Sequence, residues 1–373
     1  MGDLLTLFGL VLGIITLEST IDVRTVSINR VTIAEDIRSE WGYTEGSIEQ
    51  KLKDEAYLVM REARSFKRAS RISTPNADGS IDKVARDAGV LRLLQRIQQG
   101  VGFLEYTVTG DILAHRGKVA MELRARRFDQ QVIRARFERP KDQLDQLMQD
   151  AGWALVRLVD PHVACAALLR RSVKEGRPNP AAALRCVEEA LPVVATPDRP
   201  WLLNLRGVTL AMMDRRAEAF TTFRETLSLQ PAFPQAWLNI GTMMAADGRH
   251  QDAIKAYTTA LSYGDGAEHG SEQTNSAALV MWALSLERLD RGDDAVSKLR
   301  EAFRADKSYD LPVRLLAERV APDSNEAAEI RKIIAELSIP SGVLDWAPVY
   351  TDNLVGLIPI AAILGTATTP AGR

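Results

Sequence analysis

Two stretches of the chain, 34 residues apart, carry the same order of small and large side chains. Aligning Gly207 with Gly241 brings Phe223 onto Tyr257. A small residue in one helix lets a second helix approach closely, and a ring on the second helix fills the space beside it. Self-similarity at this period predicts a stack of helical hairpins. The other equivalent pairs are Leu203 and Trp237, Leu210 and Met244, Ala219 and Ala253, and Thr226 and Ala260.

Further copies extend this stack in both directions. A third copy, shifted by 42 residues, places Ala283 at the small position and Leu299 at the ring position. Its eight extra residues fall in the Gly-rich, polar stretch 263–275, which predicts a long loop between hairpins. A weaker copy around Val187 follows a helix expected over 161–174. A degenerate closing hairpin is expected over 311–320 and 325–337.

The repeated pattern resembles the tetratricopeptide repeat (TPR) family over roughly half of the chain. The glycine pair and the two Ala–x3–aromatic triplets carry the resemblance. It implies an all-α superhelix whose concave face, lined by the first helix of each hairpin, holds an extended peptide or a partner helix. Carried over to this sequence, the partner-binding groove contains Asn204, Met212, Asn239, Thr242, Met281 and Arg288, with Leu205, Val208, Leu238, Ala246, Val280 and Leu284 beside them.

The chemistry of this groove favours one class of ligand. Asn204 and Asn239 could each grip a peptide backbone with one donor and one acceptor. Arg288 is the only basic residue at these positions, so we do not expect capture of a free C-terminal carboxylate. A mostly apolar groove suits an amphipathic segment or self-association. An equally supported alternative is that Met212 and Met281 pack inside the superhelix or under a terminal element.

Residues 21–160 predict a separate α+β domain. The element order is β-α-α-β-β-β-α, which predicts a small, mostly antiparallel sheet. Strands are expected over 21–28, 103–112, 118–127 and 132–139, helices over 47–65, 81–98 and 141–159, a loop over 72–79, and bends over 110–117 and 128–130.

This domain resembles the N-terminal region of bacterial membrane-anchored TPR proteins. The resemblance lies in the Gly42-Tyr43-Thr44 helix entry, the three-stranded meander over 103–139, and a helix that ends near Asp160-Pro161. It implies an architecture and carries no activity with it.

A basic face is predicted on one side of the meander, formed by Arg124, Arg126, Arg134 and Arg136. One interpretation is docking of an anionic surface, such as lipid headgroups, nucleic acid or an acidic protein. The favoured interpretation is a solvated face whose arginines pair with nearby glutamates. No aromatic residue is interleaved among these arginines, which argues against nucleic acid.

The apolar stretch Leu4–Leu17 holds fourteen residues without a charge. It is shorter than the roughly 20 residues of an upright membrane span and lacks the flanks of a secretory signal. We favour a membrane anchor; a buried or partner-bound helix and the end of a longer span are the alternatives. Arg24 and Arg30 weakly favour a cytoplasmic body, and the side of the membrane stays open. A second apolar stretch, Asn353–Gly365, is expected to be a strand-like or docking tail.

No feature of the chain predicts a metal site, a cofactor or an enzyme. Cys165 and Cys186 fit neither a disulfide scaffold nor a zinc motif, so we expect buried apolar side chains on two packed helices. The four histidines have no partner at ligand spacing. Gly100-Val101-Gly102 lacks the Lys and Ser/Thr of a phosphate loop, and no Gly-x-Ser-x-Gly occurs. The net charge of -2 gives no whole-chain attraction to nucleic acid, and no small-molecule ligand is expected.

The sequence therefore predicts a bacterial protein–protein interaction scaffold that serves complex assembly. It would be tethered to a membrane through residues 4–17, otherwise cytoplasmic, and would bind a protein partner in the TPR groove. One alternative is a soluble subunit of a multiprotein complex with both apolar ends buried in neighbours. Another is a binder of an anionic ligand or nucleic acid through the basic face. The expected domains are 1–20 (apolar segment), 21–160 (α+β), 161–340 (TPR repeats) and 341–373 (tail).

Overall fold

The computed structural model of the 373-residue chain describes residues 25–63, 65, 67, 71–73, 104–127, 132–194, 196–264, 271–307, 309–336, 352, 354 and 355. It divides into an α+β unit that extends to Ala164 and a helical unit that begins at Cys165 and includes Ala63–Lys67. The boundary therefore lies inside a helix, four residues after the expected one. The expected segment 1–20 and helix 81–98 lie outside the described residues.

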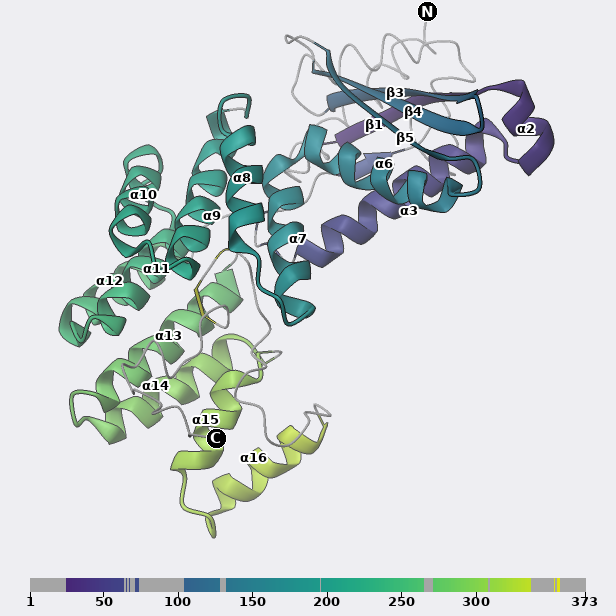
Figure 1. Cartoon of the computed structure of the whole chain (residues 1–373). Coiled ribbons are helices and arrows are strands. Elements are labelled where there is room, and N and C mark those ends of the chain that lie inside the picture. Colours follow the sequence, from purple (N-terminus) through teal and green to yellow (C-terminus); the bar gives the residue numbers. More distant parts are fainter. Residues whose placement is uncertain are drawn as a thin grey trace, which may run out of the picture. The chain divides into compact units, whose positions relative to one another are not determined.

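The α+β unit is a mixed five-stranded sheet with three described helices (Figure 1). Helix α6 packs on the last two strands, β4 and β5. The elements are β1 (Thr25–Ile33), α2 (Glu35–Trp41), α3 (Glu45–Ala63), β2 (Arg71–Ser73), β3 (Leu104–His115), β4 (Lys118–Arg127), β5 (Ile133–Pro140) and α6 (Leu144–Val159).

The strand order is β2-β1-β3-β4-β5, and β1 runs parallel to both of its neighbours. The meander β3-β4-β5 is antiparallel, as expected. The prediction of a mostly antiparallel sheet was wrong for the other half, because β1 is followed by α2 and α3, and a helical connection permits parallel pairing. The expected loop over 72–79 also begins inside β2, a strand of three residues that is too short to show an alternating pattern.

The bend between β3 and β4 is tighter than predicted. Only Arg116 and Gly117 leave the ladder, with φ of 48° and 76°, which is the two-residue hairpin geometry that matches strand twist. Gly110, taken as the start of the bend, lies inside β3. A Cβ there would lie 3.1 Å from Leu123 Cδ2, so this glycine marks a close approach within the sheet.

Helices α3 and α6 cross at a glycine. A Cβ on Gly152 of α6 would lie 2.5 Å from Glu55 Cβ and 2.8 Å from the Glu55 carbonyl carbon of α3. At the start of α3, Thr44 and Ser47 cap each other. Thr44 N–H donates to Ser47 Oγ at 2.9 Å, and Ser47 N–H donates to Thr44 Oγ1 at 3.1 Å.

The helical unit is a run of antiparallel helix pairs, a TPR-like arrangement (Figure 1). The pairs α9–α10, α11–α12 and α13–α14 pack within themselves, and the first helix of each also contacts the first helix of the next. The helices are α7 (Pro161–Lys174), α8 (Pro180–Ala190), η1 (Thr196–Asp198), α9 (Arg199–Met212), α10 (Arg216–Leu229), α11 (Pro234–Ala246), α12 (His250–Gly264), α13 (Ser271–Glu287), α14 (Gly292–Ala305), α15 (Leu311–Arg319) and α16 (Asn325–Glu336).

One feature of the sequence prediction changes in this unit and another is found as expected. The loop expected over 263–275 is shorter, because α12 extends to Gly264 and α13 begins at Ser271. The closing hairpin is present as α15 and α16 within two residues of its expected ends. Several helices begin with proline, which has no N–H to leave unpaired in a first turn; in α8 the N-cap Asn179 also accepts from Ala182 N–H at 3.0 Å.

The glycines that carry the repeat are in direct contact with the rings that carry it. A Cβ on Gly207 would lie 2.4 Å from Phe223 Cε1, and one on Gly241 would lie 2.4 Å from Tyr257 Cε1. Both rings are fully buried. The third pair has Ala283 and a fully buried leucine at these positions, because the smaller side chain leaves room for a methyl group.

The three turns within these helix pairs share one geometry that the sequence analysis missed. Asp214, Gly248 and Asp290 each adopt a left-handed conformation, with φ of 58°, 77° and 59°. The arginine after each donates its N–H to a carbonyl five residues earlier, at 2.9 to 3.0 Å, as in a Schellman motif. Each of these arginines also pairs with the acidic residue three positions later, and the pairs are Arg215–Glu218, Arg249–Asp252 and Arg291–Asp294.

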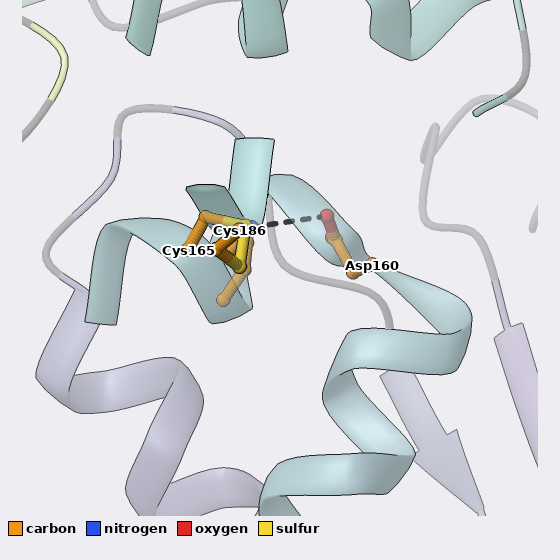
Figure 2. The surroundings of a disulfide bond; sticks show 4 residues. Asp160, Cys165 and Cys186 are labelled. Carbon is orange, nitrogen blue, oxygen red and sulfur yellow. Dashed lines mark hydrogen bonds between the residues drawn. A yellow bond between two sulfur atoms is a disulfide. The ribbon is translucent and has the colours of Figure 1, made fainter. Parts of the chain in front are cut away.

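A disulfide bond joins α7 to α8 (Figure 2). The Cα atoms of Cys165 and Cys186 are 5.6 Å apart, and both side chains are buried. The expected burial on two helices is confirmed, but the interpretation of both residues as unpaired apolar side chains was wrong. A separation of 21 residues along the chain says nothing about the distance between two folded helices.

We predict that Gly241→Ala destabilises the protein by about 1–3 kcal/mol, because the new methyl group would overlap the Tyr257 ring and push α12 away from α11. In an exposed helix the same change stabilises by about 1 kcal/mol, so the sign is diagnostic. Urea unfolding of the chain measures the difference. Gly292→Ala is the matched control, because nothing lies within 4 Å of a Cβ there; equal effects of the two changes would contradict the ring contact.

We predict that replacing both cysteines by alanine lowers the stability of the helical unit by about 3 kcal/mol, the closure entropy of a loop of 21 residues. Thermal unfolding with and without dithiothreitol provides the measurement. The reductant should lower the midpoint of the wild-type chain and leave that of the double variant unchanged. If dithiothreitol leaves the unfolding midpoint of the wild-type chain unchanged, the result would be evidence against the disulfide bond.

Candidate functional site: an amide pair and the tail segment

Two asparagines lie side by side on the first helices of neighbouring pairs. Asn204 belongs to α9 and Asn239 to α11, and both side chains are completely buried. Asn239 Nδ2 donates to Asn204 Oδ1 at 3.0 Å. These two residues, which we call the amide pair, therefore form a connected polar site between two helices whose other buried residues are mostly apolar.

The amide pair holds the main chain of a segment from the C-terminal end of the same chain. Asn204 Nδ2 donates to the Asp352 carbonyl oxygen at 2.7 Å, and Asn239 Nδ2 donates to the same oxygen at 3.1 Å. In return, Leu354 N–H donates to Asn239 Oδ1 at 2.8 Å. One residue of the segment thus supplies an acceptor, and a residue two positions later supplies a donor.

Asp352, Leu354 and Val355, which we call the tail segment, are buried at this site. Their exposed fractions are 0%, 0% and 2%. Val355 also belongs to the hydrophobic cluster formed by buried residues of α11 to α16. Main-chain hydrogen bonds and apolar burial therefore act together, and each buried polar atom of the amide pair named above has a partner. Of the stretch 353–365, interpreted as a strand-like or docking tail, the structure describes Leu354 and Val355, and both are buried.

The other predicted groove residues have different surroundings. Met281 is fully buried in the same hydrophobic cluster, in keeping with the alternative that it packs inside the superhelix. Met212 is half-buried near the end of α9. Arg288 is exposed after the end of α13, where its charge helps to lower the pKa of the neighbouring His250, after the larger effect of burial. Partner binding at these positions stays a prediction.

Thr242, the remaining predicted groove residue, is also buried. Its Oγ1 donates to the Leu238 carbonyl oxygen at 2.9 Å, one turn back along α11. Burial raises the pKa of the nearby Tyr257 hydroxyl, and the neighbouring Thr242 and Ser285 hydroxyls only partly oppose the rise. The Tyr257 ring is fully buried in the hydrophobic cluster that also contains Leu238 and Met281.

The charge of the basic face is partly neutralised by carboxylate side chains of the same sheet. Arg124 lies 2.7 Å from Asp111 Oδ2 and 2.9 Å from Glu122 Oε1, and these hydrogen bonds raise the pKa of its guanidinium group. Arg136 pairs with Glu138 at 2.9 Å. Arg126 and Arg134 are exposed on the same two strands. Two of the four arginines thus follow the favoured interpretation, and docking of an anion to the face stays a prediction.

Within the described residues, no cluster of His, Cys, Asp or Glu has the arrangement of a metal site. No helix in the same part of the chain is long and apolar enough to cross a membrane. The predicted anchor 4–17 lies outside the described residues.

Sequence reasoning identified Asn204 and Asn239 but not what they hold. Both asparagines were predicted from the groove positions of the TPR family, whereas Asp352 and Leu354 are recognised through main-chain atoms, which every residue carries. These hydrogen bonds therefore left no side-chain signal in the sequence of the tail.

Comparison with known proteins adds little to these findings. No protein-family model matches the chain. No curated protein matches it either. Three solved structures of MamA are similar to part of it. A MamA RS-1 ArsTM double mutant is 18% identical with a TM-score of 0.34, covering 48% of this chain and 95% of its own. MamA 41-end from Desulfovibrio magneticus RS-1 is 17% identical with a TM-score of 0.34, covering 49% and 98%.

A further MamA crystal structure is 19% identical with a TM-score of 0.30, covering 45% of this chain and 86% of its own. Scores this low carry no structural or functional argument. The TPR-like class of the helical unit therefore follows from its own helix pairs and from the contacts of Gly207 and Gly241.

We predict that Asn239→Ala releases the tail segment. The change removes the acceptor of Leu354 N–H and one donor to the Asp352 carbonyl, and leaving such buried groups unpaired costs about 1–3 kcal/mol each. Hydrogen exchange followed by mass spectrometry should show slow exchange at Leu354 in the wild type and fast exchange in the variant. Thr258→Ala, on the exposed side of α12, is the control and should leave Leu354 protected.

Proposed function

We propose that this chain is a protein-interaction scaffold whose helical unit recognises extended chain segments through their main-chain atoms. The observation that supports the proposal is the amide pair, which offers two N–H donors and one acceptor to a neighbouring backbone. A backbone edge is common to all polypeptides, so this site suits a protein ligand instead of a metabolite or a nucleic acid.

The surroundings of the amide pair support the same class of ligand. Leu205, Val208, Leu238 and Val280, which belong to the first helices of three successive pairs, are buried. Apolar burial supplies most of the free energy of association between proteins, while the hydrogen bonds fix the register of the bound segment.

A photocrosslinking experiment in the native host tests this proposal. A benzophenone amino acid replaces Met212, near the end of α9, in one strain and Thr258, on the exposed side of α12, in another. We expect protein adducts from position 212 that are absent from position 258 and that Asn239→Ala weakens. The same adducts from both positions, or adducts unaffected by Asn239→Ala, would count against recognition by the amide pair.

We propose further that residues 4–17 tether the chain to a membrane with the helical unit in an oxidising compartment. The uncharged stretch supports the tether. The disulfide between Cys165 and Cys186 supports the compartment, because such bonds persist mainly outside the reducing cytoplasm. Arg24 and Arg30 weakly favour the opposite side, but large domains are translocated largely regardless of flanking charge.

Fractionation and thiol trapping test this second proposal together. Without detergent, the full-length chain should sediment with membranes, and deletion of residues 4–17 should release it. After acid trapping of whole cells, a maleimide reagent should label Cys165 and Cys186 only when a reductant is added. A chain that stays soluble with residues 4–17 intact contradicts the tether, and labelling without reductant contradicts the compartment.

A further inference from the structure

The tail segment occupies the site that would hold a partner. The Asp352 carbonyl and the Leu354 N–H use the two donors and the acceptor that Asn204 and Asn239 direct toward it. The side chains of Leu354 and Val355 are buried at the same time. A second extended segment could not make these hydrogen bonds while the tail segment is in place.

We propose that the tail segment is a built-in competitor whose recognition pattern defines the ligand of the site. The ligand is an extended peptide of a protein partner that carries Asp-x-Leu-Val or a close variant, and it binds when it displaces residues 352–355. This inference rests on the proposed function and adds to it the pattern of the ligand and a means of regulation.

The pattern follows from the contacts of the tail segment. Asp352, position one of the pattern, supplies a carbonyl oxygen that accepts from both amide groups. Leu354, position three, supplies the N–H that donates to Asn239. Position three is fully buried and position four nearly so, with Val355 placed in an apolar cluster, so both favour aliphatic side chains. The side chain at position one is also fully buried, so the site accommodates a short polar residue there.

The competition follows from the length of the connection. Fifteen residues, 337–351, separate the end of α16 from Asp352. Because the tail segment belongs to the same chain as the amide pair, its binding is intramolecular, and short connections of this kind give effective concentrations on the order of millimolar. A separate peptide with equal contacts therefore binds weakly to the intact chain, whereas a partner with extra contacts, or a chain whose tail is released, binds far better.

The test measures binding of a fluorescent peptide with the sequence of residues 350–356 to the full-length chain. Fluorescence anisotropy should detect little binding to the wild type. Leu354→Asp places a charge in a fully buried apolar position and releases the tail, so we expect at least a tenfold gain in affinity. Adding Asn239→Ala to this variant should abolish the gain, and a peptide with Leu354 replaced by Asp should not bind.

A second variant guards against misfolding. Replacement of residues 352–355 by Gly-Ser-Gly-Ser removes the ligand pattern without introducing a charge, and it should show the same gain. Circular dichroism confirms that each chain is folded. Folded variants that fail to bind the peptide would overturn the inference. Dimers of the wild type that Leu354→Asp dissolves would overturn it too, because the occupant would then be the tail of a second copy.

The two proposals fail in different ways. If adducts form from position 212 but the peptide does not bind, the proposed scaffold function is supported and the proposal of a built-in competitor is contradicted. If the peptide binds in a manner that depends on Asn239 but no partner adduct forms in the host, the tail segment is a ligand of its own site and the proposed scaffold function is contradicted.

Discussion

Two contacts between a ring and a backbone set the spacing of the helical unit. Phe223 lies against Gly207 and Tyr257 against Gly241, so close that a single methyl group on either glycine would overlap the ring. These contacts fix how deeply each second helix settles on its first helix. Since α9 and α11 also contact one another, they hold Asn204 and Asn239 within hydrogen-bond distance. The position of the amide pair therefore depends on the packing of Gly207 and Gly241 in the same two helices.

The sequence predicted the parts of this arrangement that repeat. The spacing between Gly207 and Gly241 was sufficient to predict the hairpins, because the same packing requirement occurs in each repeat. The two asparagines were predicted from the groove positions of the TPR family. The recurring Arg-x-x-acid turn of Arg215, Arg249 and Arg291 was visible in the same alignment and was overlooked. It stabilises each turn only modestly, since exposed ion pairs contribute about 0–1 kcal/mol, so it leaves a weak signal among charged residues.

The features that the sequence did not predict occur once and depend on distance in space. The parallel pairing of β2 with β1 involves three residues, too few for periodicity. The bond between Cys165 and Cys186 depends on the placement of two helices. The contact of Asp352 with the amide pair uses atoms that every residue has. Each of these is a tertiary event without a local pattern, and for that reason propensity and spacing could not reveal it.

The tail segment also changes how this kind of array should unfold. Helical repeats normally contact only their neighbours, so they can fray from either end and fold from any point. Here the hydrogen bonds from Asn204 and Asn239 span 148 and 113 residues of sequence, and they connect the tail segment to α9 and α11, the first helices of two neighbouring pairs. Because these hydrogen bonds connect distant parts of the chain, the last helices and the earlier helices of the unit should unfold together in one cooperative transition. The contact between the tail segment and the amide pair should also form late in folding, because bringing together residues so distant in sequence has a large entropy cost.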